Sequence, residues 1–103
     1  AYEISLGLVG SEMCIRDSYR NIERNWEVTA HLANAVIEVP TLFLAGERDM
    51  VIAGASAANL QSRIGQVATD LRDVVLVPGI GHWVQQEAPD ETNGALLDVL
   101  DKL

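Results

Sequence analysis

Two side chains in this sequence have the types and positions that proton transfer requires, Asp49 and His82. Each follows an apolar run and a glycine, so each is presented just beyond a strand end. An imidazole has an unperturbed pKa near ~6.5, which makes both of its protonation states accessible at neutral pH. A carboxylate that accepts a hydrogen bond from the ring fixes its tautomer and stabilises the imidazolium, and the histidine then works as a general base. The alternative is that His82 is a structural histidine that happens to follow a turn.

Two buried strands and a connecting helix must position these side chains. Residues 41–45 and 74–77 are apolar without polar alternation, which is typical of strands covered on both faces, and Pro78 ends the second strand. Apolar residues at spacings of three and four predict a helix over about residues 55–65: Ala57, Leu60, Ile64, Val67 and Leu71. Strand, helix and strand form a βαβ unit with parallel strands. The carboxyl ends of such strands share the edge where α/β sheets bind ligands, so we expect Asp49 and His82 to be neighbours.

A helix is predicted on each side of this unit. Residues at helical spacing between residues 19 and 33, with charged residues on the other side, indicate an amphipathic helix: Ile22, Trp26, Thr29 and Ala33. A C-terminal helix begins at Pro89, and its apolar stripe consists of Leu96, Val99, Leu100 and Leu103. Gly94 lies within this helix and costs up to ~1 kcal/mol relative to alanine. The pattern as a whole predicts an α/β fold.

Composition excludes several classes of protein. The chain has 103 residues, enough for one small domain, and a formal net charge of −8, which argues against a nucleic-acid partner. No apolar run approaches the ~18 residues of a membrane span, and the single cysteine, Cys14, cannot form an internal disulfide. We therefore expect a cytoplasmic protein without a membrane partner, cofactor or metal. The sequence is compatible with a homo-oligomer.

The first eighteen residues differ in character from the rest. Residues 6–18 resemble the translation of a sequencing adapter, a contaminant found at the ends of proteins predicted from short-read metagenomic data. On this interpretation residues 1–18 are non-native, Cys14 carries no functional information, and the natural protein extends further upstream. The alternative is a genuine N-terminal segment of weak helical character.

From residue 19 onward the chain resembles the C-terminal part of epoxide hydrolases of the α/β-hydrolase fold. Three groups of residues carry the resemblance: Tyr19-Arg20-Asn21 with Asn25-Trp26, Pro40-Thr41-Leu42-Phe43 with Gly46-Glu47-Arg48-Asp49, and Pro78-Gly79-Ile80-Gly81-His82-Trp83 with Gln85-Gln86-Glu87-Ala88-Pro89. The resemblance implies that residues 19–38 are the end of a cap domain and the return to the core. Residues 39–103 are then the C-terminal part of the hydrolase core, with strand, helix, strand and helix in that order.

The resemblance also implies a two-step hydrolysis of a small hydrophobic epoxide. In this family an aspartate opens the epoxide to an alkyl-enzyme ester, and water activated by a histidine then cleaves the ester to release a diol. Asp49 matches the family's acid, His82 its base, and Tyr19 one of two cap tyrosines that hydrogen-bond the epoxide oxygen. Trp83, beside the base, either lines the substrate site or fills the core.

The nucleophile of such an enzyme has no counterpart in these residues. Ser56, in Gly-Ala-Ser-Ala-Ala, comes near to a nucleophile-elbow pattern, but it follows no strand directly and lies between the acid and the histidine. We interpret it as a helix N-cap and expect the nucleophile upstream of residue 1. Two alternatives to an epoxide hydrolase remain: a haloalkane or fluoroacetate dehalogenase of the same fold, and a non-catalytic fragment. The chain by itself is expected to be inactive.

Overall fold

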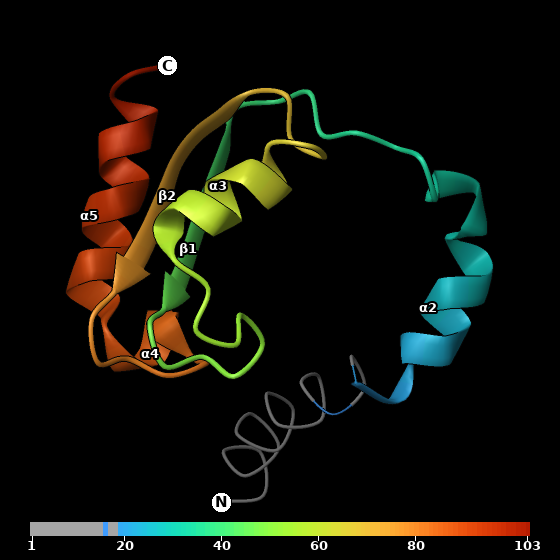
Figure 1. Ribbon diagram of the computed structural model, residues 1–103, viewed down its shortest axis with the longest axis horizontal. Coiled ribbons are helices and arrows are strands. Elements are labelled where there is room, and N and C mark those ends of the chain that lie inside the picture. Colours follow the sequence, from blue (N-terminus) through green and yellow to red (C-terminus); the bar gives the residue numbers. More distant parts are fainter. Residues whose placement is uncertain (1–15, 17–18) are drawn as a thin grey trace, which may run out of the picture. The chain divides into compact units, whose positions relative to one another are not determined.

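The computed structural model describes residue 16 and residues 19–103 (Figure 1). The expectation of a non-native tract over residues 1–18 therefore falls, apart from residue 16, outside the described residues. The chain divides into two compact units, residues 1–35 and residues 36–103. Across the described part of the chain, no helix combines the length and apolar character that crossing a membrane requires.

The described part of the first unit contains the helix α2 (Ile22–Val28), which a 3₁₀ turn, η1 (Ala30–Leu32), follows. The single helix expected over residues 19–33 is thus interrupted at Thr29, whose hydroxyl donates a hydrogen bond to the Asn25 carbonyl oxygen. Such back-bonding bends helices and competes with their regular pattern. None of the residues of α2 is buried, and Trp26 is 81% exposed.

The second unit is built on two parallel strands, β1 (Thr41–Gly46) and β2 (Leu71–Val77), which α3 (Ala57–Ile64) connects. This confirms the predicted βαβ unit and the α/β fold. Gly46 pairs with Val77 in the register, so the two strands end level with each other. The strand β2 begins earlier than its apolar run, and it includes Leu71, which the sequence pattern placed on the helical stripe. The helix α3 ends at Ile64 with Gly65 as its cap residue, which agrees with the predicted end near residue 65; the Gly65 N–H still donates to the Gln61 carbonyl oxygen.

Two further helices follow β2: α4 (Val84–Glu87), a single turn, and α5 (Pro89–Leu100). The predicted C-terminal helix begins at Pro89 as expected and contains Gly94. The short helix α4 was not predicted. The expected N-cap role of Ser56 is confirmed, because its hydroxyl oxygen accepts a hydrogen bond from the Asn59 N–H at 3.2 Å.

Apolar side chains from the strands alternate between two clusters, one on each face of the sheet. The first cluster packs α3 on the sheet and contains Ala45, Ile52 and Leu60, with Phe43, Ile64, Val74 and Leu76 against them. The second contains Val77, Val84 and Ala88, with Leu44, Val75 and Ile80 against them. The helix α5 contacts both strands, and α3 and α5 lie on opposite sides of them (Figure 1). Both faces are covered, but most strand residues are only half-buried because each strand has one partner among the described residues.

Candidate active site

The candidate acid, Asp49, and the candidate base, His82, lie on two loops that leave neighbouring strand ends. The acid loop, residues 47–51, follows β1, and the base loop, residues 78–83, follows β2. Since the strands are parallel and end at paired residues, both loops emerge at the same edge of the sheet. The predicted juxtaposition of Asp49 and His82 is therefore a consequence of the strand register.

Hydrogen bonds tie the two loops together below the pair. The Glu47 N–H donates to the Val77 carbonyl oxygen at 2.9 Å, and the Arg48 N–H donates to the Ile80 carbonyl oxygen at 2.8 Å. In the opposite direction, the Gly79 N–H donates to the Glu47 carboxylate at 3.0 Å. The loops therefore continue the pairing of the strands for several residues beyond the sheet.

Two glycines allow this close approach. A Cβ atom added at Gly46 would lie 2.1 Å from the Gly81 carbonyl oxygen and 2.3 Å from that of Ile80, far inside any ordinary contact. Gly79 has a φ of +73°, in the left-handed region that glycine adopts without strain. The backbone of the base loop thus lies directly against the end of β1.

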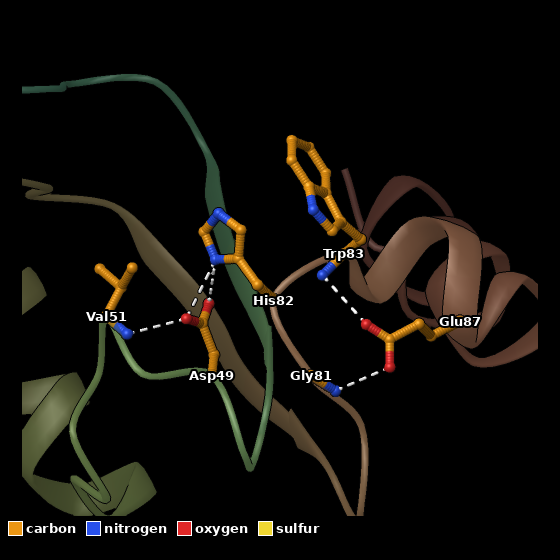
Figure 2. A network of polar contacts seen from close by, with 6 residues as sticks. All are labelled: Asp49, Val51, Gly81, His82, Trp83 and Glu87. Carbon is orange, nitrogen blue, oxygen red and sulfur yellow. Dashed lines mark hydrogen bonds and ion pairs between the residues drawn. The ribbon is translucent and has the colours of Figure 1, made fainter. Parts of the chain in front are cut away.

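His82 donates its Nδ1 hydrogen to the Asp49 carboxylate, with Nδ1 3.0 Å from Oδ1 and 2.9 Å from Oδ2 (Figure 2). The Asp49 residue is buried, at 8% exposure, whereas 39% of the His82 side chain is exposed. A carboxylate cannot donate, so this contact assigns the hydrogen of the neutral ring to Nδ1. In this tautomer the unprotonated ring nitrogen is Nε2.

The carboxylate has a second partner within its own loop. The Val51 N–H donates to Asp49 Oδ1 at 2.8 Å, which fixes the side chain in an Asx-type turn. This hydrogen bond is the largest influence on the pKa of Asp49 and lowers it; burial acts in the opposite direction, and the hydrogen bond and charge of His82 lower it further. The pKa lies below its ordinary value, so Asp49 is ionised at neutral pH, as a group that stabilises an imidazolium must be.

The two other expected site residues lie in different surroundings. Trp83 is half-buried and packs edge-to-face against His82, with ring centroids 5.1 Å apart and planes at 73°. Trp83 thus contacts the His82 ring directly, while its contact with a substrate stays a prediction. Tyr19 belongs to the first unit and is 54% exposed, and its role toward an epoxide oxygen also stays a prediction.

One polar residue beside the base loop, Glu87 at the end of α4, was given no role from the sequence. The Glu87 carboxylate accepts hydrogen bonds from the N–H groups of Gly81 and Trp83, the residues on either side of His82 (Figure 2). A glutamate that follows a histidine by five positions is a weak signal, and the contact depends on the unpredicted helix α4. The site as described therefore consists of Asp49, His82, Trp83 and Glu87.

Comparison with known proteins points to one family. No family model matches the chain. Epoxide hydrolase A of Mycobacterium tuberculosis is 45% identical over 85 residues, which are 82% of this chain and 25% of that protein. The crystal structure of epoxide hydrolase A from Mycobacterium thermoresistibile superposes with a TM-score of 0.66 and 49% identity, over 81% of this chain and 25% of that one. Potato (Solanum tuberosum) epoxide hydrolase I gives a TM-score of 0.67 and 33% identity, over 82% of this chain and 27% of that one.

These matches cover most of this chain but only part of each relative. It spans about a quarter of the length of the curated relatives that it matches. Within that quarter, both sequence and three-dimensional structure agree, and the matched fold is the mixed α/β arrangement described above. The chain is therefore homologous to the C-terminal quarter of epoxide hydrolases of the α/β-hydrolase fold.

Proposed function

We propose that this chain supplies the acid and the base of an epoxide hydrolase, with Asp49 as the acid and His82 as the base. The observation that carries the proposal is the hydrogen bond between His82 Nδ1 and the buried Asp49 carboxylate at the shared edge of two parallel strands. The homology to epoxide hydrolases supports the choice of reaction.

In the proposed reaction an aspartate upstream of these residues opens the epoxide and forms an alkyl-enzyme ester. Tyr19 hydrogen-bonds the epoxide oxygen and gives it the phenol proton as the epoxide C–O bond breaks, which leaves a hydroxyl group on the ester and a phenolate at Tyr19. This first step requires neither Asp49 nor His82 as a base. It leaves a covalent ester whose breakdown depends on activation of water.

His82 acts in the second step. Its Nε2 takes a proton from water while the water oxygen bonds to the ester carbonyl carbon, and the ionised Asp49 stabilises the resulting imidazolium. Collapse of the tetrahedral intermediate breaks the ester C–O bond, and the departing diol oxygen takes the proton from the imidazolium. The nucleophile is left as a carboxylic acid, which returns its proton to the Tyr19 phenolate. The carboxylate, the phenol and the neutral histidine are thus restored, and a vicinal diol leaves.

A chimera tests the assignment of the base. Residues 19–103 replace the matching segment of epoxide hydrolase A from Mycobacterium tuberculosis, which supplies the rest of the fold. In this chimera His82→Gln is expected to leave ester formation intact and to slow ester hydrolysis by at least ~10²-fold, the usual contribution of a general base. Mass spectrometry of the intact protein then detects the trapped ester after incubation with an epoxide.

The chain's second histidine provides a matched control. His31 lies in η1, within the first unit, and His31→Gln removes the chain's other imidazole while leaving Asp49 and His82 unchanged in sequence. The control is expected to turn over like the unsubstituted chimera. If His82→Gln accumulates no ester and keeps full turnover, the proposed role of His82 is wrong.

The substrate class is tested separately in a protein that carries this chain with its natural upstream sequence. Turnover of terminal epoxides, with a loss of activity in Tyr19→Phe, is the expected result. Turnover of haloalkanes or fluoroacetate in place of epoxides would identify a dehalogenase of the same fold and would overturn the proposal.

A further inference from the structure

The base loop is anchored by a carboxylate that the proposed reaction does not use. Glu87 Oε2 accepts a hydrogen bond from the Gly81 N–H at 3.0 Å, and Oε1 accepts one from the Trp83 N–H at 3.2 Å (Figure 2). The two donors are the backbone groups immediately before and after His82. One side chain therefore bridges the residues on both sides of the base.

The turn of α4 makes this bridge possible. The Glu87 N–H donates to the Trp83 carbonyl oxygen at 2.9 Å, which closes one helical turn and returns the Glu87 side chain to the loop from which the helix began. Gly81 leaves room for the carboxylate, since a Cβ atom there would lie 3.0 Å from Glu87 Oε1. Glu87 thus hydrogen-bonds to the base loop through both its backbone N–H and its carboxylate.

We propose that Glu87 is a positioning residue for the His82 base, an inference that rests on the function proposed above. Asp49 orients the imidazole ring, and Glu87 holds the backbone to which the ring is attached. Two hydrogen bonds to one carboxylate, from N–H groups on either side of His82, restrain the loop backbone against both translation and rotation. A shift of ~1 Å in a catalytic group can lower a rate by up to ~10²-fold.

The proposal predicts an effect on one chemical step only. In the chimera described above, Glu87→Ala removes both acceptors and is expected to slow ester hydrolysis by ~10-fold or more, while ester formation stays within ~2-fold of the unsubstituted rate. Glu87→Gln keeps one acceptor oxygen at the same distance from the backbone. It is expected to recover part of the lost rate and to be the variant of choice if Glu87→Ala does not fold.

A charge-matched control separates anchoring from a general loss of negative charge. Glu91 lies in the first turn of α5, four residues after Glu87, and is exposed. Glu91→Gln removes one carboxylate charge from the same region and is expected to leave both steps unchanged. If it slows ester hydrolysis as much as Glu87→Gln does, the effect is electrostatic and the positioning role is refuted.

Hydrogen exchange provides a readout that is independent of turnover. Loss of the carboxylate is expected to speed exchange of the Gly81 and Trp83 amides in Glu87→Ala, measured by mass spectrometry of peptides that cover the base loop. Unchanged exchange, or an equal fall in the rates of both chemical steps, would overturn the proposed role of Glu87. Full turnover of the His82→Gln chimera without accumulation of the ester would refute the proposed function, and the exchange result would still decide the anchoring.

Discussion

Substitution of Gly46 by alanine tests how closely the two loops must approach each other. The new methyl group would lie 2.1 Å from the Gly81 carbonyl oxygen and 2.3 Å from that of Ile80, whereas ordinary contacts begin at 3.4 Å. The obstacle is backbone and not a flexible side chain, so the base loop must retreat by roughly 1 Å.

That retreat has two calculable consequences. Overpacking of this kind lowers the free energy of unfolding by about 1–3 kcal/mol. It also lengthens the contacts of 2.9 and 3.0 Å between His82 and Asp49 to about 4 Å, which is beyond hydrogen-bond range. We therefore expect Gly46→Ala to slow ester hydrolysis by ~10²-fold, because the base is displaced by ~1 Å.

The measurement compares two glycines that undergo the same chemical change. Gly94 lies within α5, and a Cβ atom added there would meet nothing within 4 Å. Gly94→Ala is therefore expected to stabilise the chimera by up to ~1 kcal/mol through helix propensity and to leave turnover unchanged. Denaturant unfolding and single-turnover kinetics are recorded for both variants. A Gly46→Ala chimera as stable and as active as its parent would refute the inference that the loops touch.

Ser56→Ala removes the N-cap acceptor of α3 and is expected to lower the stability of the chimera by about 1 kcal/mol, measured by denaturant unfolding. Diol formation should be unchanged, and its loss would show that the serine takes part in the chemistry. Because the fold lowers the pKa of Asp49, the ionised carboxylate contributes stability that is complete above the unfolded value of 3.8 and is lost as pH falls through the lower folded value. The stability difference between the chimera and its Asp49→Asn variant should therefore shrink in melts below about pH 4; a constant difference would contradict this. The 103-residue chain alone is expected to aggregate or to melt without cooperativity, since its two strands leave both sheet edges unpaired among the described residues; a sharp melt of a soluble monomer would contradict this.

The sequence by itself determined the elements whose causes are local. Apolar runs without polar alternation, ended by glycine or Pro78, identify the two strands, and Pro89 marks the start of the last helix. The order of strand, helix and strand then requires parallel strands, so the proximity of Asp49 and His82 also follows from the sequence. Ser56 was recognisable as an N-cap because capping involves only the next few residues.

Contacts between distant segments were decided only by the tertiary structure. The start of β2 at Leu71 depends on where the neighbouring strand offers hydrogen-bond partners, which a helical spacing of apolar residues cannot show. A side chain at position 46 would collide with the backbone carbonyl groups of Ile80 and Gly81. These residues lie more than thirty positions away in the sequence, so the need for glycine at this position could not be seen from its neighbours in the chain. Glu87 reaches the loop around His82 only because α4 forms a single turn there. The sequence therefore predicted the strands and helices, and with them the two side chains that could transfer a proton. The contacts that hold the loops of these side chains in place depend on backbone packing between segments that are distant in the sequence.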